Sequence, residues 1–339
     1  MSRRAARAAS VPRIDPVSQA KRPFWSVMIP TYESGGLLEP TLRSVLAQDP
    51  GPDQMQIEVV DDCSSADPPE PVVDRLARDR VDVYRQPVNV GISANFTTCI
   101  RRSVGEWVHI LHGDDLVRET FYEHARSVID ANEDVGAVIF GCDVIDHAGA
   151  IVESSEPLRA EAGILDEALV RALFSYNAIR TPAVIVRRSV YEEIGGFAPT
   201  LSYTADWDMW KRILATAPTW FEPEVLALYR THEAADSANA SASGRSARED
   251  LVSIKLARNY LDAERSADYT RAAYAEKRRE AWRLARANGD RDGLAKRSVY
   301  IRHVVRCLAG EATERARGLG RRANLGVTTR LRSVDAAEP

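Results

Sequence analysis

The sequence GEWVHILHGDD, residues Gly105–Asp115, places a short apolar run directly before a glycine and two adjacent carboxylates. The run has the length and composition of a buried strand. Ligands in an open α/β sheet bind beyond the carboxyl ends of the strands, and carboxylates there can hold a hard divalent cation. The segment therefore predicts a ligand site at Asp114, although His112 stands where an aspartate would be expected.

Strand-like and helix-like patterns alternate around this segment. Apolar runs typical of strands lie at residues 25–30, 56–60, 81–85 and 104–111, and helical spacing lies at 37–48, at 71–80 and from 89 onward. This alternation predicts an α/β fold with a mostly parallel central sheet and helices on both faces. Further helices are expected at 118–131, 164–174, 190–194 and 206–215, and further strands at 135–143, 182–187 and 225–230.

The composition is that of an ordinary globular chain. Its 339 residues are 45% hydrophobic and 28% charged, enough for one large domain and a smaller appendage. The net charge of -4 hides basic ends and an acidic middle, which suit anionic surfaces and a metal site respectively. The four cysteines are far apart and form no CxxC pair, which indicates a reducing compartment and a cytoplasmic location.

The same patterns divide the chain into five regions. Residues 1–23 carry arginines without an apolar core, so they predict a disordered basic arm and not a signal peptide. The α/β domain is expected over 24–233, followed by a flexible loop at 234–247, a helical C-terminal appendage at 248–320 and a disordered tail at 321–339. The apolar runs are all too short to span a bilayer, so any membrane contact is expected to be peripheral.

Polar side chains follow all four predicted parallel strands. They are Thr31, Tyr32 and Glu33, then Asp61 and Asp62, then Asn89, Ser93 and Asn95, and last His112 and Asp114. An aspartate at a strand end can accept hydrogen bonds from a nucleotide base or from ribose hydroxyls. Taken alone, however, Asp61–Ser64 fits a helix cap or an Asx turn better than a binding site.

Seven segments, in this order, resemble the inverting family 2 glycosyltransferases of GT-A fold. They are VMIPTYES, IEVVDDCSS, NVGISAN, GEWVHILHGDD, GGF, ADWDMW and LYRTH, spread over Trp25–Asp236. The resemblance implies a Rossmann-like half that binds a UDP-, dTDP- or GDP-linked sugar, with Mn²⁺ or Mg²⁺ bridging its diphosphate. The donor contacts that it implies come from Thr31, Tyr32, Glu33, Asp62, Asn89, Ser93, Asn95, His112 and Asp114.

The DxD motif of that family falls on His112, Gly113 and Asp114, and the resemblance implies that Asp114 and His232 bind the metal. A neutral imidazole at position 112 suits Mn²⁺ better than Mg²⁺, which prefers oxygen ligands. The competing interpretation of His112 is a histidine at the sheet edge without a catalytic role. Arg230 either offsets diphosphate charge or is an ordinary surface arginine.

The resemblance also implies that Asp206 is the catalytic base that deprotonates the acceptor hydroxyl. Asp208 is a competing candidate, and the sequence would equally support Asp206 as a helix N-cap. Thr181, Pro182 and Trp207 are candidates to shape an acceptor pocket, with core packing as the alternative for Trp207.

The resemblance thus implies a metal-dependent inverting transferase of the hexosyltransferase type. Its acceptor would be a hydroxyl-bearing glycan or lipid-linked molecule of cell-surface polysaccharide or glycolipid synthesis. A degenerate, non-catalytic binding protein is the alternative, because His112 and Ala205 depart from the pattern. A nucleotidyltransferase is disfavoured because the usual lysine-containing glycine-rich loop is missing. The basic C-terminal helices predict either a peripheral membrane contact or a solvated face, and no nucleic-acid module accompanies them.

Overall fold

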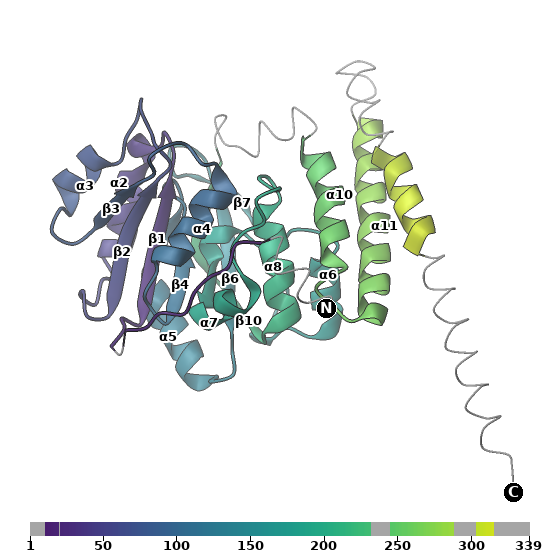
Figure 1. Ribbon diagram of the computed structural model, residues 1–339, viewed down its shortest axis with the longest axis horizontal. Helices are drawn as coiled ribbons and strands as arrows, with labels where there is room; N and C mark the ends of the chain where they lie inside the picture. The colour runs from purple at the N-terminus through teal and green to yellow at the C-terminus, as the bar shows by residue number, and fades with distance from the viewer. Residues whose placement is uncertain (1–10, 20, 232–244, 288–302, 315–339) are drawn as a thin grey trace, which may run out of the picture. The chain divides into compact units, whose positions relative to one another are not determined.

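The computed structural model describes residues 11–19, 21–231, 245–287 and 303–314 (Figure 1). These fall into two compact units. The first comprises residues 1–170 and 178–242, and the second comprises residues 171–177 and 243–339.

The first unit is built on one sheet, whose first four strands are parallel and come from the first third of the chain. The strands are β1 (Trp25–Thr31), β2 (Met55–Asp61), β3 (Asp82–Arg85) and β4 (Trp107–Ile110), connected by α2 (Gly35–Leu46), α3 (Glu70–Leu76) and α4 (Ile92–Arg102). β1 lies between β2 and β4 and is parallel to both. All seven residues of β1 are buried, which explains its continuous apolar run.

The second half of this unit adds strands of mixed direction. The elements are β5 (Leu116–Val117), α5 (Phe121–Ala131), β6 (Ala137–Ile145), β7 (Ile151–Ser154), β8 (Gly163–Ile164), α6 (Glu167–Leu173), the 3-10 turn η1 (Thr181–Ala183), β9 (Val184–Arg187), α7 (Arg188–Ile194), α8 (Ala205–Thr216) and β10 (Thr219–Arg230). The strand order is β3-β2-β1-β4-β9-β6-β10-β5, with β9 antiparallel to both of its neighbours. The sheet is therefore mixed, and the four adjacent strands β3, β2, β1 and β4 form the parallel part that the sequence predicted.

Helices pack on both faces of β1. Val27 and Ile29 belong to a core cluster that includes Leu38 and Leu42 of α2. Met28 is equally buried but lies outside that cluster, and successive strand residues point to opposite faces. The expected α/β fold class with a helical appendage is confirmed.

The second unit is helical. It contains α10 (Arg245–Ala257), α11 (Ala263–Ala287) and a further helix over 303–314, which α11 contacts through an ion pair between Arg278 and Glu311 at 2.7 Å. A Cβ on Gly310 would lie 2.5 Å from the Tyr274 ring, so the two helices approach closely there. Among the described residues, no helix is long and apolar enough to cross a membrane.

The N-terminal segment 11–19 differs from the disordered arm expected over residues 1–23. It belongs to the first unit, and Ile14 is buried with 1% of its surface exposed. Its order comes from this single apolar side chain and from backbone carbonyls that accept hydrogen bonds from residues almost two hundred positions away. A window-based pattern cannot detect partners at that separation.

Candidate active site

The carboxyl ends of β1, β2 and β4 lie side by side. Thr31 pairs with Asp61 in the sheet, and the N–H of Gly113 donates to the carbonyl oxygen of Pro30 at 3.2 Å. A Cβ at position 113 would lie 2.6 Å from Cγ2 of Thr31. Glycine therefore lets the turn after β4 lie directly against the end of β1.

This turn carries three side chains able to hold a metal ion. His112, Asp114 and Asp115 each offer one ligand atom, and these atoms lie within 4.8 Å of one another. The Asp115 carboxylate is buried, and its Oδ1 accepts the N–H of Arg230 at 2.8 Å. Its Oδ2 is also buried and has no hydrogen-bond partner of good geometry among the described residues.

The Arg230 side chain fastens the turn to the rest of the sheet. It is buried, and its Nε donates to the carbonyl oxygen of Asp114 at 2.8 Å. Its Nη1 donates to the carbonyl oxygens of Asp146 and His147, both at 2.8 Å. Arg230 is thus a structural clamp behind the site and not the surface arginine that was one interpretation.

The His112 ring is held on two sides. Its Nδ1 lies 3.3 Å from Oδ2 of Asp115, and its ring stacks on Phe96 at a centroid distance of 5.0 Å. A carboxylate beside Nδ1 favours the tautomer protonated there, which leaves the lone pair on Nε2. That Nε2 is buried and has no hydrogen-bond partner among the described residues.

The charges around His112 perturb its titration. Burial lowers the pKa of His112, but the contact with Asp115 and the charges of Asp114 and Asp206 outweigh it, so the pKa is raised. Burial, together with the neighbouring charge of Asp114, raises the pKa of Asp115 to about 6. The site concentrates negative charge, which a cation would offset.

Asp206 lies in the first turn of α8, within electrostatic reach of His112. Asp208, the competing candidate, is fully buried and pairs with Arg212 at 3.1 Å. Trp207 is buried as well, with Nζ of Lys211 3.1 Å from its ring centroid, so core packing describes it. Of the two carboxylates in this turn, Asp206 is the accessible one.

Two carboxylates expected to contact the donor also hold loops together. Glu33 accepts hydrogen bonds from the N–H groups of Ser65, Ala66 and Asp67 at 2.7 to 2.9 Å, and these bonds, led by that of Ser65, lower the pKa of Glu33. Asp62 likewise accepts the N–H groups of residues 90 and 91 at 2.7 and 2.9 Å. Both carboxylates shape the edge of the site through the loops that they fix.

The other expected donor residues divide by exposure. Asn95 is buried and donates to the carbonyl of Val60 at 2.9 Å, while Thr31 and Ser93 are also buried and bonded within the fold. Tyr32, with 54% of its surface exposed, and Asn89 are open to solvent. His232 lies outside the described residues.

Thr181 and Pro182, expected at an acceptor pocket, are buried in η1. The Pro182 carbonyl oxygen lies 2.9 Å from Nε2 of His109 in β4, so η1 contacts this strand. The sequence singled out Asp115 as one of two adjacent carboxylates but gave it no separate role, whereas Phe96 was not expected at the site. The stacking of Phe96 on His112 depends on tertiary structure.

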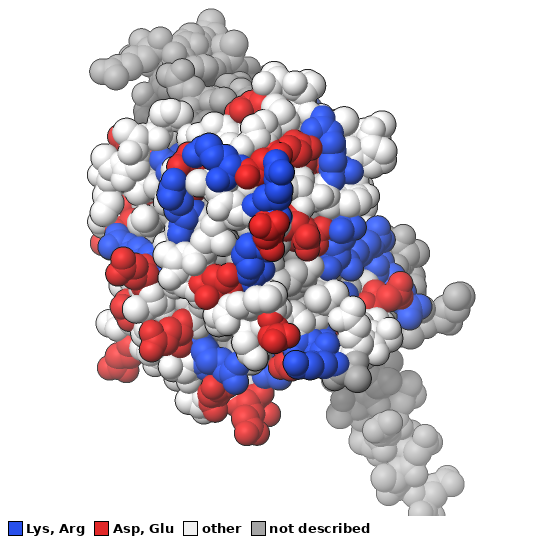
Figure 2. All heavy atoms as spheres, turned by 90° about the vertical axis from the view of Figure 1, so that its left-hand side faces the viewer, with Lys and Arg blue, Asp and Glu red and all other residues white. Residues whose placement is uncertain are grey.

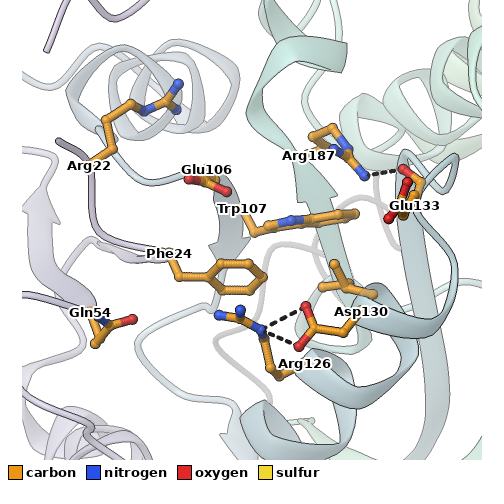
Figure 3. A pocket seen from close by; sticks show the side chains of 10 residues that line it. Arg22, Phe24, Gln54, Glu106, Trp107, Arg126, Asp130, Glu133 and Arg187 are labelled. Atoms are coloured by element: carbon orange, nitrogen blue, oxygen red, sulfur yellow. Dashed lines mark hydrogen bonds and ion pairs between the residues drawn. The ribbon is translucent and has the colours of Figure 1, made fainter. Parts of the chain in front are cut away.

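A separate pocket lies at the opposite edge of the sheet, at the amino ends of β1 and β4 (Figure 3). Its volume is about 630 Å³. Arg126 stacks over Phe24 at 3.8 Å and pairs with Asp130 at 2.7 Å, and Arg187 donates to the Glu133 carbonyl at 2.7 Å. Its arginines are occupied by the protein itself, so the pocket offers little for a ligand.

The face drawn in Figure 2 carries basic and acidic side chains interspersed among its described residues. In α2 and α3, ion pairs join Glu39 to Arg43 at 2.7 Å and to Arg75 at 2.6 Å. Nucleic-acid binding typically uses a continuous basic surface, and the mixed charge on this face differs from that pattern.

Comparison with known proteins identifies the class. The model of glycosyl transferase family 2 matches residues 26–195, so the chain belongs to that family. It is 26% identical over 216 residues to an uncharacterized glycosyltransferase of Rickettsia typhi, covering 62% of this chain and 65% of the relative. It is also 26% identical over 215 residues to one of Rickettsia felis, covering 62% of this chain but 34% of the relative. The chain thus spans less than two thirds of either relative.

Solved structures share the fold. Residues 1–349 of Staphylococcus aureus TarS in complex with UDP-GlcNAc give a TM-score of 0.65 at 16% identity, covering 84% of this chain and 81% of that one. The mannosyltransferase PcManGT of Pyrobaculum calidifontis, in complex with GDP-Man and Mn²⁺, gives 0.52 at 18% identity and covers 92% of each chain. At these identities the similarity concerns the fold.

Proposed function

We propose that the chain is a metal-dependent, inverting glycosyltransferase of the hexosyltransferase type, which moves a sugar from a nucleotide-diphosphate donor to a hydroxyl acceptor. One observation carries the proposal: Asp206 lies within electrostatic reach of a turn where His112, Asp114 and Asp115 converge. Inversion at an anomeric carbon requires one base, which deprotonates the acceptor hydroxyl, and a cation beside it can stabilise the departing diphosphate.

The donor is proposed to be a UDP-, dTDP- or GDP-linked sugar. Structures of similar fold hold UDP-GlcNAc and GDP-Man, which supports this donor class. Tyr32 and Asn89 are exposed and free to contact the nucleotide directly. Glu33 and Asp62 would act through the loops that they hold, while Thr31, Ser93 and Asn95 would support the floor of the site.

The cation is proposed to bind at Asp114, with His232 as a second ligand and His112 beside them. The residues fit such a group, because Nε2 of His112 is buried without a hydrogen-bond partner among the described residues, and the buried Oδ2 of Asp115 has only Nδ1 of His112 nearby, at 3.3 Å. A nitrogen donor favours Mn²⁺ over Mg²⁺. When bound, the ion would offset the negative charge that develops on the departing diphosphate.

Asp206 is proposed to take the proton from the acceptor hydroxyl. Its carboxylate lies in the first turn of α8, and Asp206 is only partly buried. Asp208 is unsuited to this role because its charge is buried against Arg212. The acceptor is proposed to be a glycan or a lipid-linked molecule of cell-surface polysaccharide or glycolipid synthesis, modified in the cytoplasm.

A peripheral membrane contact through the C-terminal quarter is part of the proposal. Residues 245–339 hold 22 Lys and Arg against 13 Asp and Glu, a net charge of +9, although the whole chain has a net charge of -4. Such an excess attracts an anionic bilayer surface.

The alternative is a degenerate protein that binds a nucleotide sugar without turnover, which His112 and Ala205 motivate. A panel of nucleotide sugars is screened for thermal stabilisation with Mn²⁺, and each stabilising donor is then assayed for sugar release with Mn²⁺ or with EDTA. The proposal expects stabilisation and Mn²⁺-dependent sugar release. Stabilisation without release from any donor would favour the degenerate protein, because binding alone raises apparent stability.

A further inference from the structure

The N-terminal segment before β1 is packed onto a turn that leads to the site. It precedes residue 26, where the match to the family model begins. The carbonyl oxygen of Pro12 accepts the N–H of Gly196 at 2.7 Å, and the side chain of Ile14 is buried. Two residues of this segment therefore contact the body of the first unit through different kinds of interaction.

The segment also completes the hydrogen bonding of a buried arginine. The carbonyl oxygen of Asp15 accepts from both terminal nitrogens of Arg188, each at 3.2 Å. Arg188 is buried, and its Nε donates to the Ser103 carbonyl at 2.9 Å. Because a buried guanidinium is costly unless its donors are bonded, the carbonyl of Asp15 has a defined place in the fold.

Two glycines, Gly195 and Gly196, allow the turn to pack closely against the N-terminal segment. Gly195 has φ +83, and a Cβ there would lie 2.8 Å from the Pro12 carbonyl oxygen. On the other side, a Cβ at Gly196 would lie 2.7 Å from the side chain of Thr97 in α4. The two glycines are thus enclosed between the N-terminal segment and α4.

Contacts continue from this turn to the site. The N–H of Phe197 donates to Oγ1 of Thr97 at 3.0 Å, and its ring meets Phe96 edge-on at 5.2 Å. Phe96 stacks in turn on His112 at 5.0 Å. The carbonyl of Leu201, between the turn and α8, accepts a hydrogen bond from Ser93.

From these contacts we infer that residues 11–15 form a strap that positions the Gly195–Phe197 turn and, through it, His112 and the helix that carries Asp206. The strap touches no reacting atom, so Ile14 is a positioning residue. The inference rests on the proposed function, because it concerns the geometry between the proposed metal site and the proposed base. Small displacements of such groups reduce turnover strongly.

The test compares Ile14→Ala with Ile14→Val and with Arg13→Ala, whose side chain is exposed on the same segment. Turnover, the KM for the donor and backbone hydrogen exchange are measured well below each melting temperature. Ile14→Ala is expected to lower kcat roughly tenfold with little change in the donor KM. It should also speed exchange at Gly196 and Phe197 but not in β1, while Ile14→Val and Arg13→Ala behave like the parent.

Parental turnover and parental exchange at Gly196 in Ile14→Ala would overturn the inference. A uniform rise in exchange across the first unit would overturn it as well, because Ile14 would then contribute only to global stability. Failure of the proposed function is a different result, since the parent protein itself would then transfer no sugar. Hydrogen exchange does not depend on activity, so in either case it tests whether the strap positions the Gly195–Phe197 turn.

Discussion

Nδ1 of His112 lies 3.3 Å from Oδ2 of Asp115, a carboxylate buried behind the turn that follows β4. This pairing directs Nε2, which has no hydrogen-bond partner in the described part of the chain, away from Asp115 and towards the proposed cation site. The histidine that departs from the family pattern is therefore oriented by its neighbour, as metal-binding histidines commonly are.

His112→Asp is expected to shift the metal preference towards Mg²⁺. The replacement offers an oxygen ligand in place of a nitrogen, so the ratio of Mn²⁺ to Mg²⁺ affinity should fall roughly tenfold. Isothermal titration of each ion measures this ratio without a donor. His147→Asp, at an exposed position, serves as the control, and an unchanged ratio in His112→Asp would exclude His112 from the cation's surroundings.

Gly113→Ala is expected to disturb the site by pushing its turn away from β1. The new methyl would lie 2.6 Å from Cγ2 of Thr31, and overpacking of this kind costs about 1–3 kcal/mol. Urea unfolding measures the cost, and Gly36→Ala, where a Cβ meets nothing nearer than 3.5 Å, is the matched control. Adding Thr31→Ser to Gly113→Ala removes Cγ2, so the double variant should recover part of the lost free energy of unfolding. If the effects of the two substitutions on that free energy are strictly additive, the steric explanation is wrong.

Stability is expected to fall as the pH drops from about 6.5 to about 4, because of His109. Burial lowers the pKa of His109 from 6.5 to about 4. Within that window the unfolded chain binds a proton that the folded chain excludes, so acid favours unfolding. Between pH 7 and pH 5 this residue should cost on the order of 2 kcal/mol.

Urea unfolding of the parent and of His109→Gln at these two pH values isolates the effect. The variant should lose less stability between pH 7 and pH 5, because glutamine does not titrate. The same pH dependence in both proteins would show that His109 does not titrate differently on folding.

The second unit is expected to bind vesicles that contain anionic lipid. Its exposed apolar side chains include Trp282, Val305 and Leu308, at 46%, 58% and 48% exposure, and each basic residue near an anionic surface contributes about 1 kcal/mol. Sedimentation with phosphatidylglycerol vesicles should capture the protein at low salt but not at high salt, and Val305→Asp should weaken capture. Equal capture by neutral phosphatidylcholine vesicles would contradict the electrostatic basis.

The parts of the fold that could be predicted are those where local pattern and tertiary environment agree. β1, β2, β4 and β6 are almost wholly buried, so their apolar runs are visible in the sequence. β5 and β8 have two residues each and β7 is fully exposed, so pairing partners alone define them.

The site was predictable as a set of strand ends but not in its detailed contacts. The order of motifs indicated which residues gather at the edge of the sheet. The engagement of Glu33 and Asp62 with loop N–H groups and the burial of Arg230 depend on segments far apart in the chain. Such contacts have no local signature in the sequence.

The variant Asp206→Asn tests whether Asp206 is the base of a sugar transfer that the neighbouring turn supports. The rate of sugar transfer is measured with the donor identified in the panel of nucleotide sugars, and the Kd for that donor is measured as well. We expect a loss of transfer of about 10²–10⁴-fold with the donor Kd nearly unchanged, because a general base contributes that much to the rate and little to binding. Transfer at the parental rate by Asp206→Asn would contradict this role.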